Sequence, residues 1–540
     1  MSGFRQPEMP RDQIVLWSER LEDALPVDHP VRHVDHILHS ESFRETFRDW
    51  ENDYMLSEGK PPYHPRYLSA VYRYGMLTGV RSSRKLEAAG YNRIDVIWLM
   101  AGQCPDHATI AAFVKDHGKP LRRLFRDVLK VADLAGLVKL EQVAIDGTKM
   151  EADAGKGSVH KEESIQKYLG KLDEQIEKLE AEWQANETHE ASLLGDEGPW
   201  IPKGTESMER RLSQMKRKQE RLNQALKEIA RRREENVEAG TKPPKAIASV
   251  TDPESRVMPD KEGKSKPNYN AQLAVDTAHG VVVATQVNDE PTDCGQLTPM
   301  LKEVERQCGR LPQEVSADSQ YNTGPELAAV EEMKGVGFLP DSGDRSGPRK
   351  GENSEEEKKA EAALAVVERG EPITVEQAAL LPKDRDERID KPAFTYDAEN
   401  DTYRCPMGQT LKYVHSSQDR KKSGVMIRRQ YGNGTACATC PIASLCCKDP
   451  KKGRTINRDQ YEEHRERLRA RMNSEEGRRK YKKRRETVEP RIGWAKRGLG
   501  VRRFMRRGLE AVTTEWSLVT TAMNVAILLR NWEKVMAVIG

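Results

Sequence analysis

The segment between residues 269 and 287 constrains the fold of this chain more than any other. Apolar and polar residues alternate from Tyr269 to Asp276, the chain turns at His279-Gly280, and an apolar run follows from Val281 to Val287. A period of two residues on both sides of a glycine turn predicts an antiparallel β-hairpin. The chain therefore contains a β-sheet, and neighbouring segments have to supply further strands or cover it.

The segments around this hairpin predict an α/β core over residues 136–340. A buried strand over residues 137–147 carries Asp146, and a later strand ends at Asp318. Helices are expected before and after that later strand. The order strand, hairpin, helix, strand, helix is that of an RNase H-like core. Such a core has acidic residues on its first strand, just after its fourth strand and on a late helix, and both aspartates fall at these places.

A large insertion, residues 156–245, separates the first strand from the hairpin. Residues 160–186 and 206–235 are rich in Glu, Lys, Gln, Arg and Leu with helical spacing, and a Gly-Pro-Trp-Ile-Pro loop lies between them. This pattern predicts a long helical hairpin. Two explanations remain open: a hairpin that embraces DNA or a second subunit, and a solvated helical pair without chemistry.

Residues 1–135 predict an all-helical N-terminal domain. Short apolar patterns with helical spacing alternate there with polar turns. One predicted helix begins at a serine N-cap between Arg81 and Arg84. These two arginines are candidates for contacts to DNA phosphates, and a capped helix with a solvated basic face is the alternative.

Residues 341–400 are rich in Gly, Pro and charged residues, so we expect a charged linker with one short helix. A cysteine-containing module follows over residues 401–450. Four of its thiolates would make a tetrahedral Zn²⁺ site, namely Cys405, Cys437, Cys440 and Cys446. The module has one Cys-x-x-Cys knuckle rather than two, so reduced, buried cysteines remain the alternative.

The last part of the chain, residues 451–540, begins with a strongly basic stretch that surrounds a glutamate. Residues 451–510 contain 22 Lys or Arg against 9 Asp or Glu, which favours binding to a polyanion such as DNA without sequence specificity. Arg485, Glu489 and Lys496 are spaced by four and seven residues, which places them on one helical face. Pro490 disfavours helical geometry at Glu489, so Glu486 is the alternative acidic residue.

The chain shows no signal for export or membrane insertion. Its N-terminal residues are charged and lack an apolar signal-peptide segment, and the apolar run Trp516–Leu529 is too short to cross a bilayer as a simple helix. We therefore expect a cytoplasmic protein without a membrane partner, in which this run forms a packed amphipathic helix. The 8 cysteines are expected to be reduced in that compartment.

The ordered set of motifs resembles the bacterial insertion-sequence transposases of the DDE type over nearly the whole chain. The helical leading domain of that family is similar to His64-Pro, Arg81-Ser-Ser-Arg84 and Pro105-Asp-His-Ala-Thr-Ile110. The motifs of its catalytic core resemble Asp146-Gly-Thr-Lys, Asp252-Pro-Glu-Ser-Arg, Tyr269-Asn-Ala-Gln, Ala317-Asp-Ser-Gln-Tyr-Asn and Arg485-x-x-x-Glu489-x-x-x-x-x-x-Lys496. One branch of the family also has the pattern Cys405-Pro with Cys437-x-x-Cys440.

The resemblance implies the chemistry of the site. Asp146, Asp318 and Glu489 would be the DDE triad, holding two Mg²⁺ or Mn²⁺ ions, with Arg485 and Lys496 as the basic residues around the glutamate. The family has a tyrosine three positions before its arginine. Tyr481 lies four positions before Arg485, so it receives no catalytic role.

The same resemblance implies partners and a reaction. The partner would be double-stranded DNA, both transposon ends and target, on a nucleoid-associated protein. Hydrolysis would cut the element ends, and the freed 3′-hydroxyl would attack target DNA. The helical domain would recognise the terminal inverted repeats, and pairing of two ends implies a homodimer or higher assembly.

Three alternatives share parts of this pattern. A transposon-derived DNA-binding protein would keep the fold with a distorted, inactive metal site. A metal-dependent nuclease without strand transfer would use the same carboxylates. An interaction protein would be built on the helical hairpin and the cysteine module, with the acidic residues serving local hydrogen bonds only.

Overall fold

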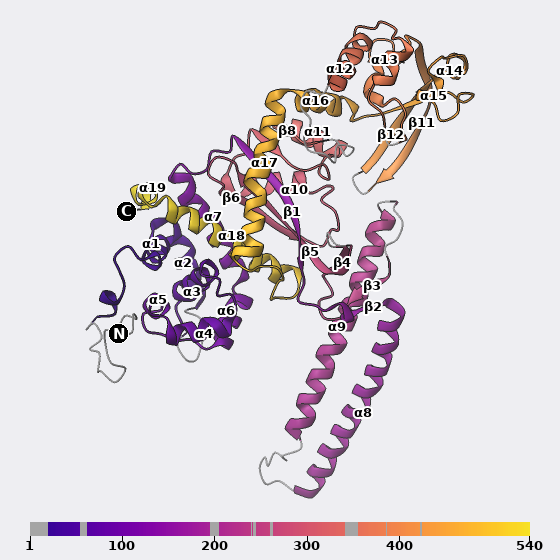
Figure 1. The fold of residues 1–540 in the computed structure, drawn as a ribbon. Helices are drawn as coiled ribbons and strands as arrows, with labels where there is room; N and C mark the ends of the chain where they lie inside the picture. The colour runs from indigo at the N-terminus through magenta and orange to yellow at the C-terminus, as the bar shows by residue number, and fades with distance from the viewer. Residues whose placement is uncertain are drawn as a thin grey trace, which may run out of the picture.

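The structure is a computed structural model of the chain. It describes residues 20–54, 62–194, 205–238, 240, 245–259, 263–340, 355–384, 386–421 and 424–539. Figure 1 shows four parts: a group of N-terminal helices, a central sheet, a long helical hairpin inserted between strands of that sheet, and a smaller module with its own sheet.

A six-stranded mixed sheet lies at the centre. Its strands pair in the order β4-β5-β1-β7-β8, and β6 also pairs with β5. Strand β1 is antiparallel to β5 and parallel to β7, and β7 is parallel to β8. The strands are β1 (Gln142–Glu151), β4 (Arg256–Pro259), β5 (Ser265–Asp276), β6 (Val282–Asn288), β7 (Glu314–Ser316) and β8 (Val336–Phe338). The predicted hairpin is confirmed as β5 and β6, which pair antiparallel.

Helices cover this sheet on both faces. Strand β5 is buried without interruption from residue 267 to residue 276, so its alternating side chains are covered on both sides. Helix α17 packs against β1, β5, β7 and β8, whereas α10 packs against β5 and β6. These helices are α10 (Leu297–Cys308), α11 (Gly324–Glu332) and α17 (Glu475–Gly493). The order strand, hairpin, helix, strand, helix is therefore observed along the chain.

The N-terminal part is helical, as predicted, but it has no separate hydrophobic core. Its helices are α1 (Pro30–His39), α2 (Glu41–Tyr54), α3 (Pro65–Leu77), α4 (Ser83–Asn92), α5 (Ile94–Leu99), α6 (His107–Asp116) and α7 (Gly118–Leu134), after the short η1 (Leu21–Ala24). One cluster of buried apolar side chains continues from these helices into the central sheet. The expected boundary near residue 135 is therefore a boundary in secondary structure and not in packing.

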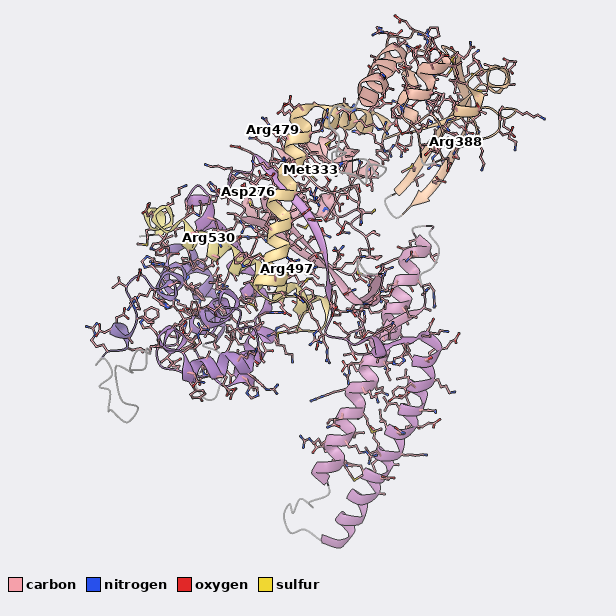
Figure 2. All side chains as sticks on the ribbon, in the orientation of Figure 1. Asp276, Met333, Arg388, Arg479, Arg497 and Arg530 are labelled. Carbon is pink, nitrogen blue, oxygen red and sulfur yellow. The ribbon has the colours of Figure 1, made fainter. Side chains whose placement is uncertain are left out.

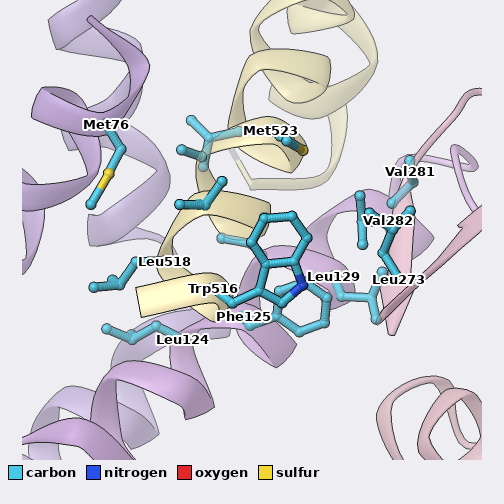
Figure 3. Close-up of a cluster of buried hydrophobic side chains, with 14 of the residues drawn as sticks. Met76, Leu124, Phe125, Leu129, Leu273, Val281, Val282, Trp516, Leu518 and Met523 are labelled. Carbon is cyan, nitrogen blue, oxygen red and sulfur yellow. The ribbon is translucent and has the colours of Figure 1, made fainter. Parts of the chain in front are cut away.

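Helix α18 (Leu509–Arg530) joins the two regions. It packs against α3 and α7 on one side and β6 on the other. Figure 3 shows Trp516 at the centre, with Leu124 and Phe125 of α7 nearby and Val282 and Leu273 of the sheet beyond. The helix is long and apolar enough to cross a membrane by length and composition, but most of it is buried inside the protein. The run is thus longer than expected, and it is enclosed on nearly all sides rather than amphipathic.

The insertion forms the predicted helical hairpin. Helices α8 (Glu162–Leu194) and α9 (Thr205–Glu238) run side by side and project away from the sheet (Figure 1). A small ladder of β2 (Val159–Lys161) and β3 (Ile247–Ser249), preceded by η2 (Lys156–Ser158), closes its base. Its own apolar core includes Leu172, Leu222 and Ile229.

The segment expected to be a charged linker is folded where the structure describes it. It forms α12 (Glu355–Glu368), α13 (Val375–Leu380), η3 (Lys391–Ala393) and β9 (Thr395–Asp397). Ala363, Val367 and Phe394 lie in one core with the cysteine module. Apolar residues are few in this segment, but they lie on the sides that face that core, so the low average hydrophobicity was misleading.

The module has a five-stranded antiparallel sheet with the order β13-β12-β11-β10-β9. Its further elements are β10 (Thr402–Arg404), β11 (Thr410–Lys421), β12 (Gly424–Gly432), α14 (Gly434–Ala438), α15 (Ala443–Cys446) and β13 (Thr455–Asp459). Helix α16 (Glu462–Asn473) leads from the module back to the sheet, where it packs against α11 and β8. The chain ends with η4 (Trp494–Gly498), α18 and α19 (Trp532–Ile539).

Candidate active site

The two predicted aspartates meet at one edge of neighbouring strands. Asp146 lies on β1, and Asp318 follows β7 by two residues. Because β1 and β7 run parallel, with Ala144 opposite Ser316, both carboxylates lie at the same end of the strand pair. The backbone N–H of Gly147 donates to Asp146 Oδ1 at 2.9 Å, and that of Gln320 donates to Asp318 Oδ1 at 2.8 Å.

Helix α17 places a buried guanidinium against this pair. Arg484 Nη2 lies 3.0 Å from Asp146 Oδ2, and the Arg484 residue is only 5% exposed. Its Nε donates to the carbonyl of Ile145 at 3.5 Å. Tyr481, Arg484 and Val488 recur at three and four positions, so they share the face of the helix that is turned toward β1.

Burial and charge crowding shift the ionisation of both aspartates. Burial raises the pKa of Asp146 to about 6, Arg484 opposes this shift, and the neighbouring Asp318 and Asp293 add to it. Burial also raises the pKa of Asp318, while backbone hydrogen bonds and Arg484 oppose it. The site thus gathers more negative charge than the single guanidinium offsets, which is a suitable environment for a divalent cation.

A third aspartate lies at the same place, although the sequence patterns did not single it out. Asp293 Oδ1 accepts hydrogen bonds from Asn270 Nδ2 at 2.7 Å and from Gln272 Nε2 at 2.6 Å. Both donors lie on β5, and Gln272 is directly opposite Gly147 of β1. A Cβ at Gly147 would overlap with Asp293 Oδ1, so the glycine lets this carboxylate lie next to Asp146.

Gln272 connects the site to the hydrophobic core. The side-chain amide of Gln272 is fully buried, and its oxygen accepts a hydrogen bond from the hydroxyl of Tyr321. The backbone carbonyl of Gln272 accepts a hydrogen bond from Trp516 Nε1 at 3.1 Å. Core packing therefore fixes the position of the strand that holds Asp293.

The ion pair that the structure shows for Glu489 is with Arg485 and not with a residue next to the two aspartates. Its side chain is 53% exposed, and it pairs with Arg485 at 3.3 Å on the outer side of α17. The helix continues through Pro490 to Gly493, so Glu489 is helical although the following proline disfavours that geometry. Proline removes only one hydrogen bond there, and the helix is held on the sheet by buried residues before and after it. Glu486 is exposed as well.

The other predicted basic residues have different surroundings. Lys496 lies in the π-helical turn η4, and its Nζ donates to the carbonyl of Lys149 at 3.3 Å. It borders a cavity of about 320 Å³ lined by Lys149, Glu151, Lys266, Asn268, Lys496, Arg497 and Arg502. Lys149 and Glu151 of this cavity lie on β1, three and five residues beyond Asp146.

Arg81 has an intramolecular role, contrary to its expected contact with DNA. Its guanidinium pairs with Glu515 at 2.7 Å and donates to the carbonyls of Gly500 and Arg503. Its side chain is 11% exposed, and its charge is offset by a buried carboxylate. Arg84, in contrast, is exposed on α4 and remains open to a phosphate.

The outer side of α17 is basic along its length. Figure 2 shows Arg479 toward one end of the helix and Arg497 beyond the other. The exposed basic residues of α17 are Arg478, Arg479, Lys482, Lys483 and Arg485. These residues lie on the helix that places Arg484 against Asp146, and they favour binding of a polyanion to this helix.

The donor atoms fit a hard divalent cation, but they are not drawn together as ligands. Within the part of the chain that the structure describes, no three His, Cys, Asp or Glu side chains are close enough to hold an ion. Asp146 instead pairs with Arg484, which supplies positive charge at the position where a cation would be bound. Carboxylate oxygens are the ligands that Mg²⁺ and Mn²⁺ prefer, so the chemistry of the donors suits these ions.

The cysteine module brings sulfur atoms into one small core. Cys405, Cys437, Cys440, Cys446 and Cys447 all belong to it, and none forms a disulfide. Burial raises the pKa of the Cys446 thiol to about 12. The finding that no three potential ligands converge applies here too, over the described residues.

Sequence reasoning missed Arg484 and Asp293, and it gave Tyr481 no catalytic role. A signal for Arg484 and Tyr481 was present, because Tyr481 lies three positions before Arg484, which is the spacing that the family resemblance expects between its tyrosine and arginine. Burial of the Tyr481 hydroxyl raises its pKa, Arg484 opposes this shift, and the neighbouring Asp318 and Asp146 add to it, which places its ring near the site. Asp293 lies in a loop, and no local pattern marks it.

Two family models match the chain. A model described as "Transposase DDE domain" matches residues 404–529, and one described as "Transposase domain (DUF772)" matches residues 19–116. No curated protein and no solved structure matches it. The first match includes α17 with Arg484 and Glu489, and the second covers most of the N-terminal helices. These two matches, at the two ends of the chain, support the identification of the protein as a DDE-type insertion-sequence transposase.

Proposed function

We propose that this protein binds the terminal inverted repeats of a bacterial insertion sequence and catalyses metal-dependent DNA cleavage and strand transfer. The observation that carries the proposal is the meeting of Asp146 and Asp318 at one end of β1 and β7, beside the basic outer side of α17. The match to a transposase DDE domain over residues 404–529 supports a role in DNA transposition. Double-stranded DNA is therefore the partner.

Asp146, Asp318 and Glu489 would hold two Mg²⁺ or Mn²⁺ ions. Bound there, divalent ions lower the pKa of an attacking oxygen and stabilise a leaving oxygen in phosphodiester chemistry. Among the residues that the structure describes, Glu489 pairs with Arg485 on an exposed helical face. Such a surface pair contributes little stability, so breaking it to free the Glu489 carboxylate costs little.

The residues of the chain have distinct tasks in this scheme. Arg484 neutralises Asp146 before metal and DNA arrive, and it can then complement phosphate charge at the cleavage point. Arg485 and Lys496 hold the DNA backbone on either side of Glu489, and the cavity beside Lys149 accepts a neighbouring phosphate. Arg84 contributes from the N-terminal helices, whereas Arg81 is a structural residue.

Synapsis of two element ends requires at least a homodimer when DNA is bound. A protein of this kind works in the cytoplasm on nucleoid DNA. A zinc site formed by Cys405, Cys437, Cys440 and Cys446 would stabilise the module without a part in the chemistry.

The test is Mg²⁺-dependent cleavage and joining of labelled DNA that carries the element's ends. We expect the wild type to cleave and join, and we expect Asp146→Ala, Asp318→Ala and Glu489→Ala to bind the ends but do neither. Glu486→Ala is the matched control on the same helix, and it should retain both activities.

The other outcomes separate the alternatives. Cleavage without joining by the wild type favours a nuclease, and end binding with neither activity favours an inactive DNA-binding protein. Equal cleavage by the wild type and Asp146→Ala refutes the assigned site. Activity that survives in Glu489→Ala but is lost in Glu486→Ala moves the third ligand to Glu486.

A further inference from the structure

We propose that Asp293 is a further metal ligand of this centre, presented to the divalent ion that Asp146 holds. The inference rests on the proposed function, since it assigns one more residue to the same site. It begins from the position of Asp293, which lies in the loop between β6 and α10, next to Gly147, whose backbone N–H donates to Asp146 Oδ1.

The Asp293 carboxylate is held in one orientation by two amides. Asn270 and Gln272 both donate to Oδ1, and both amides come from β5, where these residues are almost fully buried. Among the residues that the structure describes, none donates a hydrogen bond to Oδ2. A carboxylate with one oxygen fixed by amide donors and the other left open is typical of a metal ligand whose orientation is set by hydrogen bonds from neighbouring residues.

The backbone of Asp293 is tied to the second aspartate as well. Its N–H donates to Gln320 Oε1 at 3.4 Å, and the Gln320 N–H donates to Asp318. Asp293 and Asp318 are therefore connected through Gln320, and Gln272, which lies opposite Gly147, holds Asp293 beside the strand that carries Asp146. Gly147 belongs to the same design, because any side chain at that position would displace Asp293.

A purely structural role is the competing explanation, in which Asp293 only satisfies the buried amides of β5. A metal-binding measurement distinguishes the two roles of Asp293. The purely structural role predicts altered stability of the variant without altered ion affinity. The probe is Mn²⁺ alone, titrated into the full-length protein without DNA and followed by electron paramagnetic resonance and calorimetry.

We expect Asp293→Asn to weaken Mn²⁺ binding at least about tenfold. This substitution keeps the shape of the side chain and removes its negative charge. Glu290→Gln is the matched control, because it removes a carboxylate from the same loop that pairs instead with Arg256, and it should leave Mn²⁺ affinity unchanged. Gly147→Ala retains every carboxylate but displaces Asp293, so it should weaken Mn²⁺ binding in the same direction.

Asp293→Cys supplies a readout that a structural role would not move. A thiolate prefers softer ions, so this variant should raise the ratio of Cd²⁺ to Mn²⁺ affinity relative to the wild type, whose other cysteines are identical. If Asp293→Asn fails to fold, Gly147→Ala and Asp293→Cys distinguish the metal-ligand role from the structural role.

The outcomes keep the two proposals apart. Wild-type Mn²⁺ affinity in Asp293→Asn, with affinity lost in Asp146→Asn, overturns the role of Asp293 and leaves the proposed function intact. Wild-type affinity in both variants overturns the metal centre itself. Loss in both, with Glu290→Gln unaffected, supports Asp293 as a ligand.

Discussion

At the residue scale, Arg484 controls the charge of the site before any ion is bound. Its guanidinium lies against Asp146 in a buried position, where an unpaired carboxylate would be costly. Even so, burial raises the pKa of Asp146 to about 6. A cation that enters the site has to compete with a proton below that pH and with Arg484 at any pH.

This ionisation predicts the pH dependence of metal binding. Because the pKa of Asp146 is raised, the carboxylate is fully available above about pH 7 and is lost as the pH falls through 6, so Mn²⁺ affinity should drop about tenfold per pH unit below that value. Calorimetric titrations between pH 5 and pH 8 measure the drop. Arg484→Gln removes the favourable charge and should move the midpoint to higher pH; a midpoint that moves down would contradict the assigned role of Arg484.

Some residues of the site can be predicted from the sequence, and Asp293 cannot. Asp146 and Asp318 follow from strand patterns, because each ends a short apolar run. Asp293 could not be found in that way, since its place depends on Asn270, Gln272 and the missing side chain of Gly147, which come together only in the folded sheet.

At the element scale, the end of α17 decides where Lys496 lies. The helix passes into the π-helical turn η4, a local geometry that is often found at functional sites. Gly498 closes this turn against the ring of Trp494, and a Cβ there would overlap with the indole. The glycine is therefore required by the close approach of the ring.

We expect Gly498→Ala to weaken DNA binding by displacing the turn that carries Lys496. The salt dependence of binding should decrease by about one phosphate contact, and thermal stability should fall by about 1–3 kcal/mol. Gly493→Ala is the control, because a Cβ at that helical position meets no neighbour. Equal salt dependence in wild type and Gly498→Ala would show that the turn does not position a DNA contact.

The cysteine module gives a second prediction at this scale. If the four predicted thiolates bind Zn²⁺, the purified protein should contain about one zinc per chain, and Cys437→Ser should lose it together with stability of the module. Atomic emission spectroscopy of the purified protein measures its zinc content. Cys294→Ser, an exposed cysteine outside the module, should retain it. Zinc near zero in the wild type supports the alternative of buried thiols.

Periodicity succeeded and failed for identifiable reasons among the elements. The β5 and β6 hairpin and the α8 and α9 pair were predictable because their patterns are local and repeat over many residues. The segment with α12 and α13 was misjudged as a linker, because Ala363 and Val367 are scattered among charges and find their partners in a module farther along the chain.

At the scale of the whole molecule, the N-terminal helices and the central sheet share one core through α18. Composition and periodicity predicted a separate N-terminal domain. They could not predict the shared core, because contacts between segments far apart in the chain leave no local pattern in the sequence. Trp516 is fully buried at this junction and donates to the Gln272 carbonyl. The junction therefore reaches from the helical part to the strand that positions Asp293.

We expect Trp516→Ala to destabilise both regions together, by about 3–5 kcal/mol. Hydrogen exchange measured by mass spectrometry should increase in α3 and in β5 to a similar extent. Trp532→Ala, at a partly exposed tryptophan stacked on His33, is the control with a smaller expected effect. Faster exchange in only one of the two regions would show that they unfold as separate units.

The position of α18 also has a consequence for biosynthesis. A ribosome makes the helices α3 and α7 long before it makes the helix that fills the gap between them and the sheet. The nascent chain must keep a large apolar surface covered during that interval, so it depends on chaperones more than a protein whose domains close in order. Frameshifts and premature stop codons almost anywhere upstream of α18 would leave an unclosed core as well as a missing helix, and such products would be degraded rather than persist as DNA-binding fragments.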